Sequence, residues 1–209
     1  MQITAKTWNE YITRLSRLNQ KAGQLMRQYI DTHGTGDADA LITYAAALVT
    51  KYGEGSAELA CQMYDALAEA ANAGVPAAEP AEPADYGEVA RMVNATKNQN
   101  PANLPNGVSR LVKRAGADTT LKNAVRDGAE WAWVPHGDTC PFCITLASNG
   151  WQKASSKVLK GGHADHIHAN CDCEFAIRFD HNTTVAGYDP EKYLAQYLSL
   201  IHISEPTRH

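Results

Sequence analysis

The chain has 209 residues, of which 44% are hydrophobic and 20% are charged, and its net charge is -4 at a pI near 6.0. This composition suits a soluble protein of one large or two small domains. It argues against a dedicated nucleic-acid-binding protein, which usually has a basic domain. With no signal peptide and no apolar run long enough to span a membrane, the sequence predicts a protein of a reducing cytoplasm without membrane contact.

The first part of the chain, residues 1–73, has the apolar periodicity of a helical bundle. A capping box at Thr7 and Glu10 predicts a first helix that ends near Gly34. A second helix is expected over residues 37–52, stopped by Gly53, and a third after residue 56. The first helix has a stripe of large apolar side chains: Trp8, Tyr11, Leu15, Leu18 and Tyr29. Most of this stripe is expected to pack against the next helices, and the remainder to dock a protein partner.

Residues 74–107 and 108–197 are the other two predicted parts. Residues 74–85 (GVPAAEPAEPAD) are too poor in large apolar groups to pack and predict a linker or surface loop, followed by a short helix over 87–97. Helices are expected over 108–115 and 119–133, and a strand over 174–179, where apolar and polar residues alternate. A local basic patch is interpreted as a solvated helix face rather than a nucleic-acid site: Lys113, Arg114, Lys122 and Arg126.

Four of the five cysteines lie close together, in a pattern that suits zinc. Cys140 and Cys143 form a C-x2-C clip, and the second arm, H-x2-C-x-C, consists of His168, Cys171 and Cys173. A three-residue separation lets two donors bind one tetrahedral ion from a single turn. A closed site uses four ligands, and the two matched clips favour Cys140, Cys143, His168 and Cys171, with Cys173 as the rival for the fourth place.

A structural zinc is favoured over the other readings of these residues. Disulfides fit poorly with an odd cysteine number and a reducing compartment. A catalytic metal needs an open position, which four protein ligands do not leave, and His163, Asp165 and His166 are not placed to replace one. Structural zinc contributes on the order of 10 to 16 kcal/mol, whereas whole domains keep about 5 to 15 kcal/mol, so the segment around Cys140 should not hold its shape without metal.

The predicted fold is therefore mainly α with a small zinc-stapled α+β element near the C-terminus. The apolar residues near the site are expected to form a small aromatic lid around it: Trp131, Trp133, Phe142, Leu146, Trp151, Phe175, Ile177 and Phe179. Two helical parts without a substrate pocket of their own suit a docking or assembly protein, and we expect no enzyme activity.

The main enzyme alternative is an HNH-type nuclease. In that reading His166, within Asp165-His166-Ile167, activates water, and the clip consists of Cys140, Cys143, Cys171 and Cys173. No second His or Asn follows at the distance that an active HNH site needs, so the assembly reading is preferred.

The last residues, 198–208, read LSLIHISEPTR, which is the translation of a transposase adapter used in sequencing libraries. We therefore expect residues 198–209 to be an adapter-derived tail, the natural reading frame to be cut near Tyr197, and the natural protein to continue beyond it.

Three segments carry a family resemblance: WAWVPHGDTCPFCITLASNGW from Trp131, then HADHIHANCDCEFAIRF and GYDPEKY. They resemble the phage minor capsid or head-morphogenesis proteins encoded next to the portal gene, and KYGEGSAELACQMYDAL fits the N-terminal part of that family. The resemblance implies a virion component, commonly carried by prophages, that joins the portal to the shell or helps assemble the procapsid in the bacterial host cytoplasm.

The partners that the resemblance implies are the portal protein and capsid or scaffold proteins, and it leaves a homo-oligomer and DNA contact open. Family members often have Arg between the last two cysteines, where this chain has Asp172. That difference argues against a nucleic-acid contact at this position.

Overall fold

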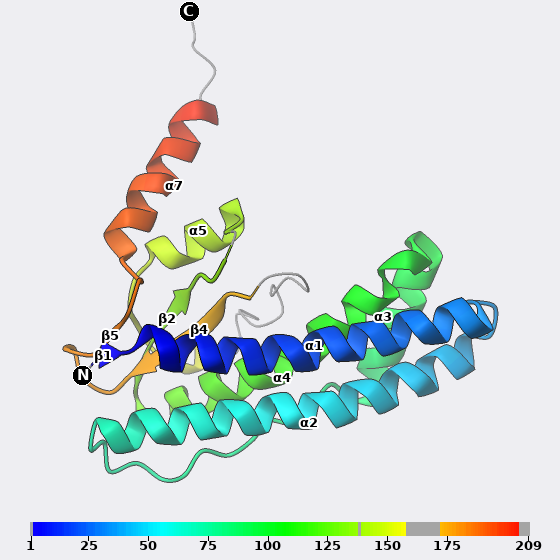
Figure 1. Cartoon of the computed structure of the whole chain (residues 1–209), viewed down its shortest axis with the longest axis horizontal. Coiled ribbons are helices and arrows are strands. Elements are labelled where there is room, and N and C mark those ends of the chain that lie inside the picture. Colours follow the sequence, from blue (N-terminus) through cyan, green and yellow to red (C-terminus); the bar gives the residue numbers. More distant parts are fainter. Residues whose placement is uncertain (1, 138, 158–171, 205–209) are drawn as a thin grey trace, which may run out of the picture.

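Three long helices form the body of the protein. The structure, a computed structural model, describes residues 2–137, 139–157 and 172–204. α1 (Ala5–His33) and α2 (Ala38–Ala70) lie side by side and are joined by a short turn, and α4 (Leu104–Asp127) packs against both (Figure 1). The predicted fold class, mainly α with a small sheet, is confirmed in the part of the chain that the structure describes.

α1 begins earlier than predicted. Its N-cap is Thr4, whose side chain accepts a hydrogen bond from the Thr7 backbone N–H at 3.1 Å. Thr7 therefore lies inside the first turn, and the predicted capping box at Thr7 and Glu10 was wrong. The predicted end is confirmed: Gly34, with φ 72°, caps the helix and donates from its N–H to the Ile30 carbonyl at 2.7 Å.

α2 is one helix where two were predicted. Gly53 does not end this helix. Its lack of a side chain lets Pro83 pack closely against α2, since a Cβ built at Gly53 would lie 3.0 Å from the Cβ of Pro83. A glycine inside a helix costs roughly 1 kcal/mol relative to alanine, which packing on both sides of the helix offsets. α4 likewise runs without a break through Gly116, where an added Cβ would lie 2.6 Å from the Ser56 Oγ of α2.

Residues 74–85 pack along α2 and α4, contrary to the expectation from their composition. Their backbone N–H groups are bound by helix side chains: Ala78 by Asp65 Oδ1 at 2.7 Å, and Ala81 by Thr119 Oγ1 at 2.9 Å. The backbone N–H of Glu79 donates to Asn123 Oδ1 at 2.9 Å. Hydrogen bonds to helix side chains thus hold this segment in place where its own apolar groups are too few to do so. The segment is an ordered surface loop.

α3 (Tyr86–Gln99) and the 3-10 turn η1 (Pro101–Asn103) follow this loop, and α3 agrees with the predicted helix. α3 is tied to α4 by Arg114, whose Nη2 donates to Glu88 Oε2 at 2.7 Å. This hydrogen bond lowers the pKa of Glu88 below its ordinary value.

The Glu88 pKa predicts a pH dependence of stability. Because the folded pKa is lowered, the contribution of the pair is present above the unfolded pKa of about 4.3 and is lost as the pH falls through the folded pKa. We expect Arg114→Met to remove about 1 kcal/mol of unfolding free energy at neutral pH and to flatten the acid limb below about pH 5. Urea unfolding across pH measures both effects. Arg91→Met, which removes a minor influence on Glu88, should leave the acid limb unchanged.

A small sheet covers one end of the three helices. β2 (Glu130–Val134) lies between β3 (Gln152–Lys153) and β4 (Glu174–Arg178) and is antiparallel to both. β4 confirms the predicted strand. β2 replaces the end of the predicted helix 119–133, because Gly128, with φ 68°, ends α4 and the next residues, EWAWV, pair with β4. β1 (Gln2–Ile3) and β5 (Thr184–Val185) form a separate parallel pair.

The apolar stripe of α1 belongs to the core. Trp8, Tyr11 and Leu15 are buried in one cluster with residues of α2, α4, β2 and β4, and Leu18 packs against it. Tyr29 packs against a second cluster at the other end of the bundle and stacks on Tyr44 at 4.2 Å. The expectation that most of this stripe packs against the other helices is confirmed, and docking of a partner by this helix stays a prediction. Helices from the predicted parts 1–73 and 108–197 share both clusters.

α5 (Pro141–Ser148) and α7 (Pro190–Ser204) pack against each other and stand away from the three-helix body (Figure 1). α7 continues through residues 198–204, which the sequence analysis assigned to the adapter-derived tail. No helix of the described residues is long and apolar enough to cross a membrane.

Candidate metal centre

The sheet brings the first clip, Cys140 and Cys143, to the same end as Cys173. β2 and β4 are antiparallel, with Val134 opposite Glu174. The chain leaves β2 toward Cys140 at the same end of the sheet at which it enters β4 from Cys173. Residues that lie more than 30 positions apart in the sequence are therefore carried to one place by the strand register.

The first clip lies on the first turn of α5. Cys140 is the N-cap residue, with φ -73° and ψ 159°, and Pro141 occupies the next position. Proline suits the first helical position because its missing N–H has no helical partner there. Cys143 completes the turn and is buried, whereas Cys140 is partly exposed. N–H groups at a helix N-terminus stabilise negative charge, which suits two thiolate ligands.

The second arm is fastened by two of the long helices. Lys113 of α4 donates from its Nζ to the Cys173 carbonyl at 2.9 Å and lies 3.7 Å from the Glu174 carboxylate. Ser16 of α1 donates to the Asp172 carboxylate. Lys113 and Glu174 are both almost completely buried. The backbone on each side of Cys173 is thus held by α1 and α4.

Lys113 corrects the interpretation of the basic patch. Sequence reasoning placed it on a solvated helix face, but it is 2% exposed and binds the start of β4. The other three residues also form contacts within the protein. Arg114 forms an ion pair with Glu88, and Lys122 lies 3.6 Å from the Glu79 carboxylate. Arg126 forms an ion pair with Asp127 and donates to the carbonyls of Pro76 and Ala77. The available signal for Lys113 was its position beside Val112, one helical turn before Ala117 and one after Ser109, on the side of α4 that is buried.

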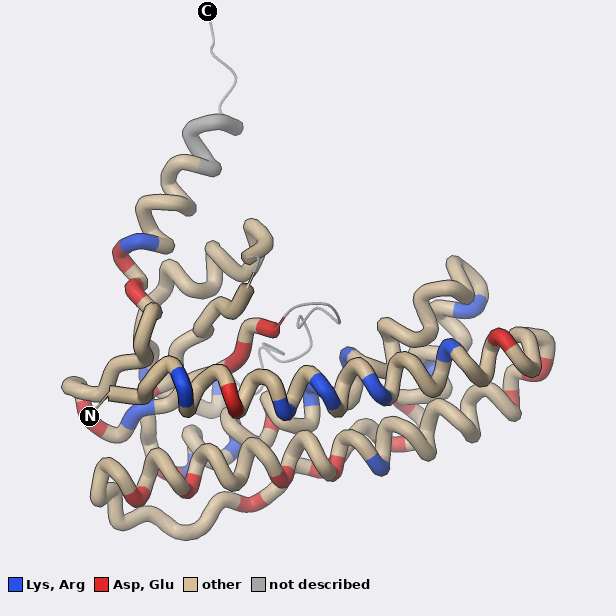
Figure 2. The backbone as a smooth tube through the Cα atoms, in the orientation of Figure 1, with Lys and Arg blue, Asp and Glu red and all other residues tan. Residues whose placement is uncertain are grey.

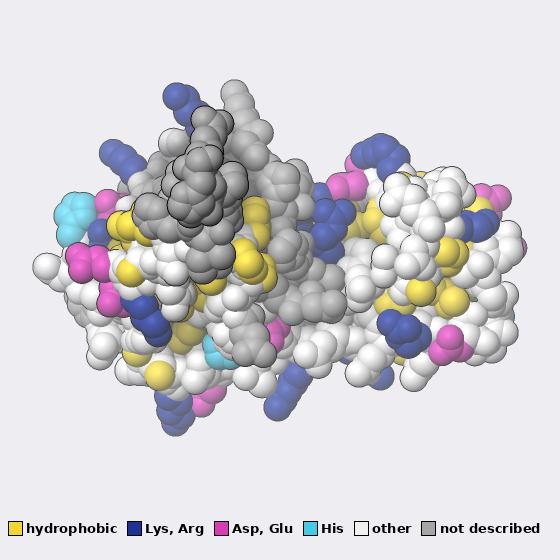
Figure 3. Space-filling view, turned by 90° about the horizontal axis from the view of Figure 1, so that it is seen from above, with side chains coloured by type: hydrophobic (Ala, Val, Ile, Leu, Met, Phe, Trp, Pro, Cys, Tyr) yellow, Lys and Arg dark blue, Asp and Glu magenta, His cyan; other side chains and the backbone are white. Residues whose placement is uncertain are grey.

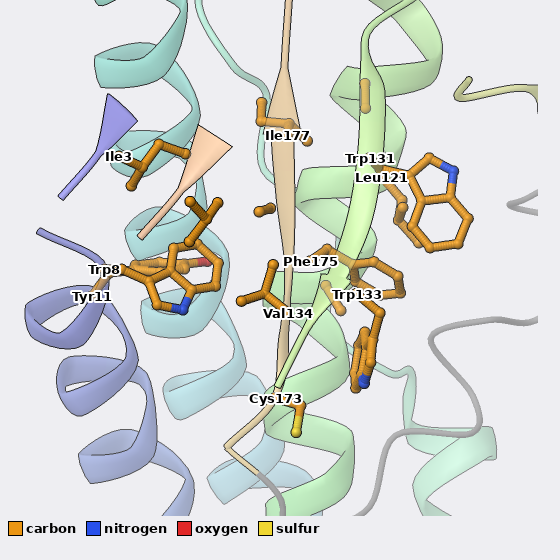
Figure 4. Close-up of a cluster of buried hydrophobic side chains, with 14 of the residues drawn as sticks. Ile3, Trp8, Tyr11, Leu121, Trp131, Trp133, Val134, Cys173, Phe175 and Ile177 are labelled. Atoms are coloured by element: carbon orange, nitrogen blue, oxygen red, sulfur yellow. The ribbon is translucent and has the colours of Figure 1, made fainter. Parts of the chain in front are cut away.

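The cysteines that the structure describes at this site lie against aromatic side chains. Cys143 and Cys173 belong to the same buried cluster as Trp133 and Phe175, whose rings are 4.7 Å apart and edge to face (Figure 4). Phe142 is an exception to the predicted lid, since it is exposed. The cluster also contains residues of α1, α2 and α4, so the lid is part of a large shared core rather than a small separate one.

α7 reaches the same end of the sheet through its first turn. Burial and, second, the charge of nearby Cys173 raise the pKa of Tyr193. Tyr188, just before α7, donates from its hydroxyl to the Ala147 carbonyl of α5 at 2.9 Å. α5, β4 and α7 therefore converge around Cys143 and Cys173.

A comparison with known protein families shows to which family the chain belongs. The family model for the VG15 protein matches residues 2–200. The chain belongs to the VG15 protein family. This is a family of viral (phage) gene products, so the expected phage origin is confirmed. No match was found to a curated protein or to a solved structure.

Two of the five predicted ligands of this VG15 family member, His168 and Cys171, lie outside the described residues, as do His163, Asp165 and His166. Cys61, Cys140, Cys143 and Cys173 are recorded as thiols. Within the ranges that the structure describes, no three His, Cys, Asp or Glu side chains converge as a metal-binding group. The structure thus brings Cys140, Cys143 and Cys173 to one end of the sheet and leaves the zinc site itself a prediction.

Proposed function

We propose that this VG15 family member is a phage minor capsid or head-morphogenesis protein that acts in portal and procapsid assembly. The supporting observation is membership of a phage protein family over residues 2–200, in a chain whose cysteine segments resemble the portal-adjacent minor head proteins. The proposed partners are the portal protein and capsid or scaffold proteins, and the proposed location is the virion and, during assembly, the bacterial cytoplasm.

The architecture supports a role in protein contacts. α7 stands away from the three-helix body, and its Leu194 is 43% exposed. Phe142, on the neighbouring α5, is exposed as well. Hydrophobic side chains also reach the surface at this end of the molecule when it is seen from above (Figure 3). Exposed apolar groups of this size are common where proteins bind one another.

Co-expression with the portal protein of the same locus tests the proposal. We expect the two proteins to copurify as a complex, because a head-assembly protein must recognise the portal or the shell that surrounds it. Capsid and scaffold proteins of that locus are tested in the same way. Failure to associate with any of the three would contradict the proposal. Cleavage of plasmid DNA with magnesium that is lost in His166→Ala would support the nuclease alternative instead.

We further propose that a structural zinc joins the two arms. The donors fit: thiolates and an imidazole are the ligands of closed tetrahedral zinc sites, and the strand register carries Cys140, Cys143 and Cys173 to one end of the sheet. The preferred set is Cys140, Cys143, His168 and Cys171, because its two three-residue clips match in spacing, and Cys173 is the alternative fourth ligand.

The choice between His168 and Cys173 can be measured. We expect His168→Ala to lower zinc affinity at least tenfold, because a lost ligand opens the tetrahedron. Cys173→Ser should lower stability, because Cys173 is fully buried, but should change zinc affinity much less. Competition with a chromophoric chelator gives both affinities. The reverse ranking would mean that the site consists of cysteines alone.

A further inference from the structure

α1 has only basic charges over half of its length. Between residues 14 and 27 it contains no Asp or Glu, and its four cations are all exposed: Arg14, Arg17, Lys21 and Arg27. We call these four residues the basic row. Arg14 donates to Gln62 at 3.4 Å. The other three have no hydrogen-bond or ion-pair partner in the part of the chain that the structure describes.

α2 has the opposite pattern. Between residues 54 and 69 it contains no Lys or Arg. Four carboxylates lie along one face of the helix, about one, two and one turns apart: Glu54, Glu58, Asp65 and Glu69. We call these the acidic row. Among the described residues no cation forms an ion pair with this row. Figure 2 shows the basic positions along α1 and the acidic positions along α2.

Neither helix gains stability from this arrangement. Like charges occur four residues apart at Arg17 and Lys21, and again at Glu54 and Glu58, which destabilises a helix. The start of α1 shows the stabilising alternative, a Lys6–Glu10 pair at 4.0 Å. The described ion pairs include none between the two rows, although their helices are neighbours. Among the described residues, no ion pair therefore neutralises either row.

The two rows match each other in length. At 1.5 Å per residue, the basic row extends about 20 Å along α1 and the acidic row about 22 Å along α2. Arg14, Arg17 and Lys21 are exposed on one face of α1, and Glu54, Glu58 and Glu69 are exposed on α2, so these side chains of two molecules can meet with several charges paired at once. We infer that this protein self-associates through the basic row of one copy and the acidic row of the next.

A second copy fits these rows better than a nucleic acid does. Phosphates would meet the basic row beside a neighbouring helix of carboxylates, in a chain with a net charge of -4. A second copy satisfies both rows with one kind of contact. Two copies related by a two-fold axis can use both rows in one closed dimer, whereas a head-to-tail contact leaves one row unused and either closes into a ring or grows.

Charge reversal tests this inference independently of the proposed function. Sedimentation velocity of the whole protein at low salt should show oligomers that dissociate at high salt. Arg17→Glu with Lys21→Glu, or Glu54→Lys with Glu58→Lys, should each weaken self-association at least about tenfold. Mixing the two variants should restore association, because each then meets a row of opposite charge. Lys153→Glu with Lys157→Glu, at exposed positions away from both rows, changes the net charge equally and should not affect assembly.

Three results would overturn the inference. One is a wild-type protein that stays monomeric at every concentration and salt. A second is self-association that the reversals leave intact or that mixing does not restore. The third is a monomeric protein that binds duplex DNA through Arg17 and Lys21, which would assign the basic row to nucleic acid.

Discussion

Purified protein is expected to contain close to one zinc ion per chain. The reason is the donor set, which can close a tetrahedron, together with the strand register that brings Cys140, Cys143 and Cys173 to one end of the sheet. Cys140→Ser with Cys143→Ser should reduce bound zinc to a small fraction, as measured by metal analysis. Cys61→Ser is the matched control: this buried cysteine lies on α2, outside both arms, and the variant should keep its zinc.

Zinc removal should also lower stability by several kcal/mol, because structural zinc contributes on the order of 10 kcal/mol of binding free energy to folding. β2 and β4 are buried against α1, α2 and α4. We therefore expect the helical far-UV signal to persist and the near-UV signal of Trp133 and its neighbours to change. Protein that is zinc-free as isolated, with a near-UV spectrum that zinc does not alter, would contradict the prediction.

Loss of the buried cation on α4 should have the second largest effect. Lys113→Met leaves the Glu174 carboxylate buried without this cation and removes the hydrogen bond to the Cys173 carbonyl. Breaking one side of a buried pair costs about 3 to 5 kcal/mol, whereas replacing both charges by apolar groups is often nearly neutral. We expect Lys113→Met to lower the unfolding free energy by about 3 kcal/mol or more, and Lys113→Met with Glu174→Met to recover most of it.

Denaturant unfolding of the single and double variants measures this coupling. Lys122→Met is the control on the same helix, because its pair with Glu79 is largely exposed and such pairs contribute about 0 to 1 kcal/mol. Similar losses for Lys113→Met and Lys122→Met would show that the buried pair has no special role. Failure of the double variant to recover stability would mean that the hydrogen bond to Cys173 matters more than the charges.

Local patterns predicted the elements whose cause is local. The apolar periodicity of α1 and its end at Gly34, the helix α3, and the alternation that makes β4 a strand were all readable from neighbouring residues. The C-x2-C spacing likewise placed both thiols on one helical turn, because residues three positions apart lie close together on a turn.

Contacts between distant residues decided the rest. Gly53 and Gly116 look like helix ends in the sequence, but each provides room for another segment, Pro83 or Ser56, to approach closely. β2 continued a helical pattern until pairing with β4 fixed it as a strand. Lysine side chains are normally exposed, and only the contacts of Lys113 with Glu174 and the Cys173 carbonyl explain its burial. The sequence alone determined which residues could bind zinc. The strand register decided which end of the sheet Cys140, Cys143 and Cys173 share, because register depends on partners some 40 residues away.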